Sequence, residues 1–245
     1  MTPGKQTLPG KPPAAPPPKA LLFAEVRGLL EPLRLVLKAP SLAAGPKGSG
    51  EPVLVLPGFG TSDRATWPIR RYLKFLGYDV RGWGLGRNHG HVGRLLPRVL
   101  EQAETWAGEA GQPLRLVGWS LGGYIGREAA RERPDLVRQV ITLGSPVVGG
   151  PKYTASAPAY RKSGFDVDEI EAIVADRERI PLEVPVVAIY SRKDGVVAWE
   201  ACIDRVNPLT HHVEVRARHF SMGFNPESLR ILADSLASKK SASRS

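Results

Sequence analysis

Cysteine is nearly absent from the sequence: Cys202 is the only one in 245 residues, which excludes an intrachain disulfide. A chain without disulfides suits a reducing compartment. There is no stretch of about 18 uninterrupted apolar residues, so no transmembrane helix is expected. Residues 1–19 also lack the apolar core and the small-residue cleavage site of a secretory signal. We therefore expect a soluble, cytoplasmic protein.

Long basic blocks are absent too, although the formal net charge is +10. Much of this excess lies near the ends, where residues 1–19 and 236–245 each carry three basic residues and no acid. No aromatic motif of an RNA-binding domain accompanies them, so we expect no nucleic-acid partner. Weak association with an anionic membrane surface is kept as an alternative.

The length and the 42% hydrophobic content favour one globular domain. Seven prolines prevent residues 1–19 from forming a packed core, so we expect a disordered Pro-rich tail there. The domain is expected to cover 20–238, with a second disordered tail over 239–245. Apolar runs typical of strands alternate with helical segments, which predicts an α/β fold with a doubly wound, mostly parallel sheet flanked by helices. Residues 146–183 interrupt this alternation, and we interpret them as a small cap over a site.

Residues 20–38 have the spacing of an amphipathic helix. We weigh two interpretations of this helix. It packs on the body of the domain, or it lies at a lipid interface with Arg27, Arg34 and Lys38 toward anionic headgroups. We favour packing on the body. The residues near its apolar face are Leu22, Val26, Leu29, Leu30, Leu33 and Leu37.

A serine flanked by glycines follows the apolar run at 114–117, and the segment Gly118-Trp119-Ser120-Leu121-Gly122 has the pattern G-x-S-x-G. An amphipathic segment comes next, and this context predicts a sharp turn between a strand and a helix. Such a turn crowds the backbone, so glycine is needed where a Cβ would collide with neighbouring chain. The serine would stand on a strained corner, with its hydroxyl clear of the sheet and a helix N-terminus beneath it.

A serine hydroxyl needs an adjacent base to act as a nucleophile, and the base needs a third group that stabilises its cation. Of five histidines, His219 lies just past the last predicted strand and can lean over the sheet. His211 and His212 open that strand, where a histidine is usually just exposed. Asp194 follows the buried strand at 185–190 and can reach a neighbouring loop. Other candidate acids lie in the cap, in helical segments or at a helix end: Asp135, Asp166, Asp168, Asp176, Asp204 and Asp234.

An oxyanion hole would complete such a site. The backbone N–H of Leu121, immediately after the serine, is the first expected donor. The second is the backbone N–H of Phe59, in the Gly-rich loop 57–61 that follows the buried strand at 53–56. This loop lacks the spacing of a dinucleotide-binding fingerprint, and no Walker lysine follows it.

The order Ser120, Asp194, His219 is that of α/β-hydrolases. The likeness spans roughly residues 50–238 and resembles, more narrowly, bacterial serine esterases and lipases. It implies the fold, a Ser-His-Asp mechanism through an acyl-enzyme, and a small-molecule or lipid ester as substrate, with no metal or organic cofactor. The segments that carry the resemblance are LPGFG at 56–60, GWSLGG at 118–123, YSRKDGVV at 190–197 and HFSMG at 219–223.

The same triad could serve an acyltransferase, a thioesterase or an amidase, and the sequence does not separate these activities. A hydrolase-fold protein without catalysis, which binds a partner through its Pro-rich tail, is an alternative of another class. All three triad positions hold residues competent for catalysis, which counts against this non-catalytic alternative. Cys202 is expected to be a buried apolar residue. Four residues next to the motifs could line an acyl pocket or belong to the core: Phe59, Trp119, Phe220 and Met222.

Overall fold

The computed structural model describes residues 11–238. The predicted tail at 239–245, the first ten residues of the predicted tail at 1–19, and the side chains of Leu29 and Leu30 lie outside the described part. Residues 11–18 contain no helix or strand.

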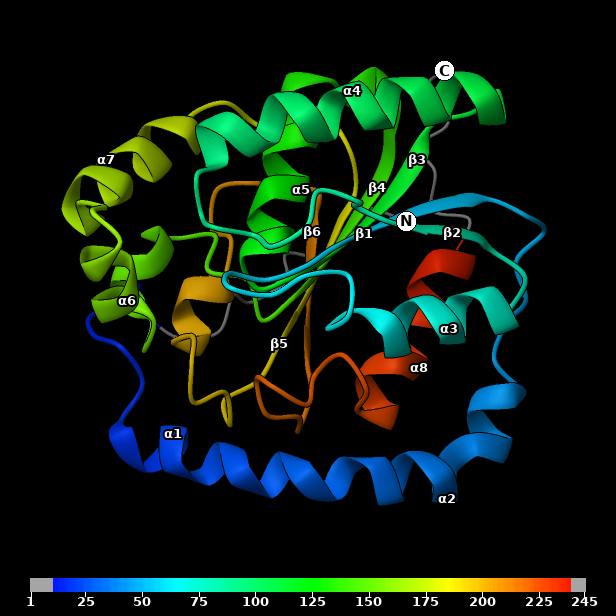
Figure 1. Ribbon diagram of the computed structural model, residues 1–245, viewed down its shortest axis with the longest axis horizontal. Helices are drawn as coiled ribbons and strands as arrows, with labels where there is room; N and C mark the ends of the chain where they lie inside the picture. Colours follow the sequence, from blue (N-terminus) through cyan, green and yellow to red (C-terminus); the bar gives the residue numbers. More distant parts are fainter. Residues whose placement is uncertain (1–10, 239–245) are drawn as a thin grey trace.

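One parallel sheet of six strands forms the centre of the molecule, in the order β2-β1-β3-β4-β5-β6 (Figure 1). This arrangement confirms the predicted α/β architecture. The strands are β1 (Pro52–Leu56), β2 (Asp79–Gly82), β3 (Leu114–Trp119), β4 (Val137–Leu143), β5 (Val186–Tyr190) and β6 (Thr210–Glu214).

Helices cover both faces of the sheet, above and below it in Figure 1. Successive side chains of a strand point to opposite faces, so a strand buried on both sides is a continuous apolar run. In β1, Val53 and Val55 pack toward α3 (Trp67–Phe75) and α8 (Pro226–Ala237). Leu54 and Leu56 pack on the other face, toward the helices α4 (Val92–Ala110), α5 (Leu121–Glu132) and α7 (Val167–Arg177).

The chain adds β2 on one side of β1 and then adds β3 to β6 on the other side, so the strand order reverses at β1 and β3 while all strands stay parallel. Loops at the carboxyl ends of two such strands diverge and leave a crevice between them. Pro57 follows β1 and Ser120 follows β3, so both segments singled out in the sequence open onto this crevice.

The excursion at 146–183 contains η3 (Gly150–Tyr153), α6 (Ala157–Lys162) and α7. Tyr160 of α6 stacks on Phe59, with ring centroids 4.1 Å apart. An isolated antiparallel bridge between Thr154 and Val197 also joins the excursion to the segment after β5. The excursion therefore lies against the loops at the carboxyl ends of β1 and β5. Two further 3-10 turns are η2 (Pro134–Leu136) and η4 (Trp199–Cys202).

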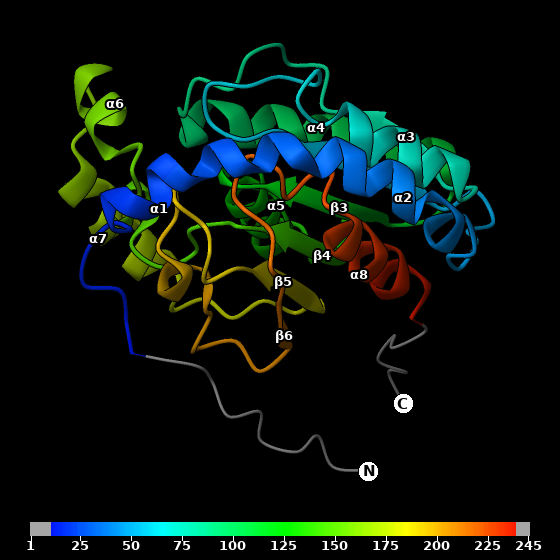
Figure 2. The same cartoon turned by 90° about the horizontal axis from the view of Figure 1, so that it is seen from below.

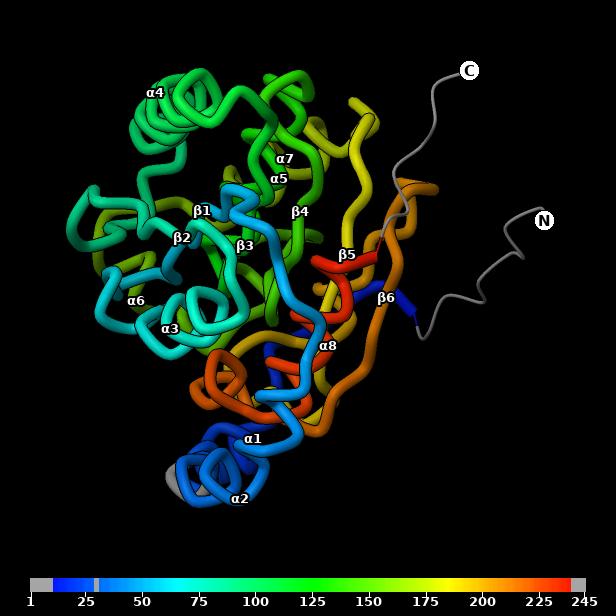
Figure 3. The backbone as a smooth tube through the Cα atoms, turned by 90° about the vertical axis from the view of Figure 1, so that its right-hand side faces the viewer, coloured from blue at the N-terminus to red at the C-terminus, as the bar shows by residue number. Residues whose placement is uncertain are grey.

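A long helical segment runs along the outside of the molecule, formed by α1 (Lys19–Ala24), η1 (Glu25–Leu30) and α2 (Glu31–Ala43) (Figures 1 and 2). Figure 3, which looks nearly along it, places it beside α8 and away from α4. We call residues 19–43 the N-terminal rod. Among residues 11–238, we find no helix with the length and apolar character needed to cross a bilayer.

The rod packs on the body, but not with the face that the sequence predicts. Glu25 and Glu31 are buried against the body, whereas Val26, Leu33 and Leu37 are 63%, 63% and 70% exposed. On the inward side, Glu25 supplies acceptors to loop backbone N–H groups beneath the rod, which a leucine could not do. The predicted residues whose side chains the structure describes are all exposed, so periodicity does not decide which side of the rod turns inward: Leu22, Val26, Leu33 and Leu37.

Candidate active site

Ser120 lies at the turn between β3 and α5 with φ 55° and ψ −124°. Within residues 11–238 it is the only non-glycine residue with a positive φ. Such a conformation costs about 1–3 kcal/mol, and it aims the side chain away from the sheet. A Cβ at Gly118 would overlap the backbone of Gly122 and Gly123, and a Cβ at Gly122 would overlap the carbonyl of Leu56. The strand–turn–helix context expected for the G-x-S-x-G pattern is therefore present.

Asp194 and His219 follow β5 and β6, and their side chains meet. Nδ1 of His219 lies 2.7 Å from Oδ2 of Asp194, and both residues are buried. The other oxygen of Asp194 accepts hydrogen bonds from the backbone N–H groups of Val196 and Val197, at 2.8 and 2.7 Å. These bonds fix the orientation of the carboxylate. A proton on Nδ1, held by Asp194, leaves Nε2 of His219 as the acceptor nitrogen.

Gly144 connects this pair to the serine. Its φ is +56°, and a Cβ there would lie 3.0 Å from Oδ2 of Asp194 and 3.1 Å from Nδ1 of His219. The residue before it, Leu143, accepts a hydrogen bond from the backbone N–H of Ser120 at 2.8 Å. The structure thus gathers Ser120, Asp194 and His219 around the carboxyl end of β4. The positive φ and these tight contacts together favour glycine at position 144.

The pKa of His219 is raised above its ordinary value by charges around the ring. Burial lowers the pKa, but the negative charge of Asp194 and its hydrogen bond to the ring outweigh burial, and Glu25 adds a further raising contribution. The imidazolium that would form during proton transfer is therefore stabilised by two carboxylates.

Phe59 and Leu121, the predicted oxyanion donors, lie on two different segments beside the serine. Leu121 is the first residue of α5, and the first N–H groups of a helix have no acceptor within the helix. The loop that carries Phe59 approaches closely, since a Cβ at Gly58 would lie 3.7 Å from Oγ of Ser120. Donation by these two N–H groups stays a prediction.

A cavity of about 470 Å³ opens beside Ser120, within the size range of small-molecule sites. Its walls come from the loop after β1, from α4 and α5, and from the excursion at 146–183. They are mostly apolar and include Phe59, Leu96, Tyr124, Tyr160, Ile170 and Val197. Of the other suggested pocket residues, Trp119 and Met222 are buried in the core, whereas Phe220 is 57% exposed.

Glu25 is a residue of the site that the sequence did not reveal. Its Oε1 accepts hydrogen bonds from the backbone N–H groups of Gly195 and His219, at 2.8 and 3.1 Å. Its Oε2 accepts one from Phe220 at 3.1 Å. One side chain of the rod thus binds both the loop after Asp194 and the loop that carries His219. Its partners are 170 to 195 positions away, so no local pattern could indicate them.

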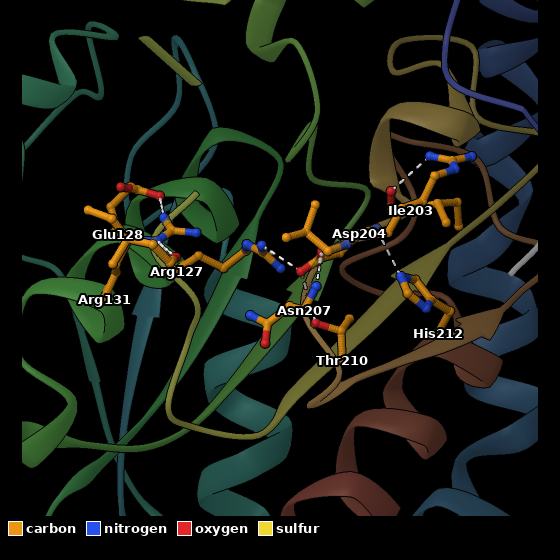
Figure 4. A network of polar contacts seen from close by, with 11 residues as sticks. Arg127, Glu128, Arg131, Ile203, Asp204, Asn207, Thr210 and His212 are labelled. Carbon is orange, nitrogen blue, oxygen red and sulfur yellow. Dashed lines mark hydrogen bonds and ion pairs between the residues drawn. The ribbon is translucent and has the colours of Figure 1, made fainter. Parts of the chain in front are cut away.

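Asp204 and His212, two of the rejected candidates, belong to a separate polar network (Figure 4). Asp204 forms a buried ion pair with Arg127 at 2.7 Å. Burial works against its ionisation, but Arg127 and backbone N–H groups hold the pKa of Asp204 below its usual value. His212 is buried rather than exposed as expected, and its Nε2 accepts from the N–H of Asp204 at 3.0 Å. Desolvation lowers the pKa of His212 to about 4, which suits a neutral structural role.

Cys202 is buried, as expected, and burial raises the pKa of its thiol. Among the residues that the structure describes, no group of three or more His, Cys, Asp or Glu side chains is placed to hold a metal ion.

A family model, described as alpha/beta hydrolase family, matches residues 53–236. The chain belongs to the α/β-hydrolase family. The N-terminal rod lies outside the matched range, so this hydrolase holds its Asp194 and His219 loops with a segment that precedes the family core.

Solved structures agree with this fold. One of the metagenome-derived lipolytic enzymes LipS and LipT has a TM-score of 0.60 at 18% identity, over 79% of this chain and 94% of that chain. A lipase-esterase related protein from Clostridium acetobutylicum has a TM-score of 0.55 at 15% identity, over 78% and 97%. The thioesterase domain from the curacin biosynthetic pathway has 0.52 at 16%, over 79% and 93%. At these identities the similarity concerns the fold alone. No curated protein matches the chain.

Proposed function

We propose that this hydrolase cleaves carboxylic esters through an acyl-enzyme on Ser120. The observation that carries the proposal is the buried pair of His219 and Asp194, 2.7 Å apart, gathered with a strained serine at the mouth of an apolar cavity. If His219 only stabilised the fold, there would be no reason for a nearby serine to adopt a disfavoured backbone conformation. Strain of this kind is kept where function requires the geometry.

In the proposed reaction, Nε2 of His219 takes the proton of Ser120 Oγ as that oxygen attacks the acyl carbon. Asp194 holds the Nδ1 proton and stabilises the imidazolium, which then gives its proton to the leaving alcohol. The backbone N–H groups of Leu121 and Phe59 would stabilise the oxyanion, and one such donor contributes about 3–4 kcal/mol. Water resolves the acyl-enzyme by the same steps in reverse.

The cavity supports an apolar acyl group as the part of the substrate that is recognised. Its walls are aliphatic and aromatic, so burying each methylene of an acyl chain contributes about 0.8 kcal/mol. We therefore expect kcat/KM to rise with acyl length across a series of p-nitrophenyl esters until the cavity is filled.

Ser120→Ala tests the proposal. The variant should lose at least about a thousandfold in kcat on a short p-nitrophenyl ester while keeping the thermal unfolding of the wild type, because only the nucleophile is removed. A fluorophosphonate probe should label the wild type and not the variant. Undiminished hydrolysis by Ser120→Ala would overturn the assignment. Products formed with and without added alcohol, and rates on matched thioesters, separate an esterase from the acyltransferase and thioesterase alternatives.

A further inference from the structure

Several large apolar side chains of the N-terminal rod are exposed between positions 23 and 37. Large apolar side chains are normally scattered singly over a protein surface, and a continuous set of them marks an interaction site. We call the following set the outer face: Phe23, Val26, Leu33, Val36 and Leu37, which are 77%, 63%, 63%, 71% and 70% exposed.

Within α2, Val36 and Leu37 follow Leu33 at the helical steps of three and four residues, and Phe23 and Val26 precede them in α1 and η1. In Figure 2 the rod lies in front of the rest of the molecule, so the side turned away from the body faces solvent. The opposite side carries the contacts to the body: Gly28 lies against Ser221, and Glu31 accepts a hydrogen bond from Asn225 at 2.9 Å. The rod is therefore seated firmly with its apolar residues outward.

The exposed charge of the rod is entirely positive. Its only two acids, Glu25 and Glu31, are 6% and 5% exposed and bind groups of the body. Lys19, Arg27 and Lys38 are exposed. Arg34 pairs with Glu31, yet 67% of its side chain is exposed. Apolar residues flanked by cations alone are the composition of helices that lie on anionic membranes.

A groove lies between α2 and α3, on the flank of the rod. It has a volume of about 860 Å³ and is lined by Leu35 and Ala39 of the rod together with Trp67 and Phe75 of α3. Both aromatic side chains are 57% exposed. Arg71 of the same groove supplies another cation. Tryptophan beside basic residues is typical of the boundary between headgroups and acyl chains.

We propose that the outer face docks this hydrolase on an anionic lipid surface. The apolar side chains would enter the boundary between headgroups and acyl chains, and the basic side chains would contact acidic headgroups. A second copy of the chain fits less well, because a symmetric contact through the rod would bring its exposed cations together without an exposed acid to pair them. The inference does not depend on the reaction at Ser120.

Sedimentation with vesicles tests this docking. The wild type should bind vesicles of phosphatidylcholine mixed with phosphatidylglycerol, bind phosphatidylcholine alone much more weakly, and dissociate as salt is raised. The double substitution Phe23→Ser with Leu37→Ser should weaken binding about tenfold or more, because each side chain loses its apolar burial. Arg27→Gln with Lys38→Gln should weaken it about tenfold or more on the anionic vesicles only.

The matched control is Val206→Ser with Leu209→Ser, which removes two exposed apolar side chains far from the rod in sequence. It should bind vesicles as the wild type does. All variants should keep the wild-type unfolding temperature and the wild-type rate on a water-soluble ester, and Ser120→Ala should bind vesicles normally. The proposal is overturned if the wild type does not bind anionic vesicles or if the control loses as much binding as the rod variants. It is also overturned if gel filtration shows a dimer that the rod substitutions convert to monomers.

Discussion

Glu25 hydrogen-bonds the N-terminal rod to the loops that carry Asp194 and His219, and the substitution Glu25→Gln tests what these hydrogen bonds do. The carboxylate accepts three backbone hydrogen bonds through two oxygens. Glutamine keeps one carbonyl oxygen and replaces the other by an amide that donates. At least one of the three N–H groups, that of Phe220 in the simplest orientation, then faces another donor.

Leaving a buried N–H without an acceptor costs about 1–3 kcal/mol. We therefore expect Glu25→Gln to lower the free energy of unfolding by about 2 kcal/mol. In the folded protein the His219 loop would be held less firmly, and a misplacement that costs about 1.4 kcal/mol in the transition state lowers kcat about tenfold.

The pH profile distinguishes positioning from a loss of stability. His219 must be neutral to accept the proton of Ser120, so activity rises as pH increases through its pKa. Glu25 contributes to raising that pKa, so removing its charge should move the acidic limb of kcat/KM toward lower pH. Stability alone does not shift this limb when the assay is run on folded protein.

Glu31→Gln is the control on the same rod, because Glu31 is equally buried but binds Asn225 instead of the two loops. It should destabilise the fold without moving the acidic limb. If Glu25→Gln leaves kcat and the limb at their wild-type values, or if Glu31→Gln moves them equally, the positioning role of Glu25 is refuted.

Three further predictions concern single side chains. Asp194→Asn should lower kcat about 10⁴-fold, by analogy with other serine triads. Asp204→Asn should instead leave kcat near normal and lower the free energy of unfolding by about 3–5 kcal/mol, because it breaks the buried ion pair with Arg127. Denaturant unfolding and steady-state kinetics check both, and the reverse pattern would assign the acid to Asp204. Gly144→Ala should lose most activity and about 1–3 kcal/mol of stability, because its φ is +56° and its Cβ would crowd the Asp194–His219 pair; a wild-type rate would contradict the crowding. Burial raises the pKa of Glu178 from 4.5 to about 7, so its protonated form stabilises the fold below pH 4.5 and this stabilisation is lost as pH rises through 7. Glu178→Gln should therefore raise stability at pH 8 by about 2 kcal/mol relative to wild type and change it little at pH 4, as thermal melts at the two pH values would show.

The sheet and the contact between Asp194 and His219 could be predicted because both follow from local patterns. Short apolar runs that alternate with helical segments are typical of strands in a covered parallel sheet, and the loops after such strands meet at one edge. Asp194 and His219 were selected by that rule alone, and the structure places them in contact. The strained conformation of Ser120 likewise followed from the glycines around it.

The polar partners of the loops were not predictable, because they are created by contacts distant in sequence. His212 carries no local sign that it binds the N–H of Asp204 across a turn, so an exposed position was the natural expectation. In the sequence, Glu25 is one acidic residue in a mostly apolar helical segment, and nothing near it indicates its partners. Only the folded chain shows that three backbone donors converge on it.

The orientation of the rod follows from a balance that periodicity cannot decide. Burying the five side chains of the outer face against the body would contribute about 1.5–3 kcal/mol each, which is a large driving force for the opposite orientation. Turning the rod would instead leave the three N–H groups bound by Glu25 without acceptors, at about 1–3 kcal/mol each, although it would return the charges of Glu25 and Glu31 to water. The apolar total of about 8–15 kcal/mol exceeds the hydrogen-bond total of about 3–9 kcal/mol, so contacts within this chain alone do not account for the observed orientation. The proposed lipid surface would remove the conflict, because it would bury the outer face while Glu25 stays on the loops of Asp194 and His219.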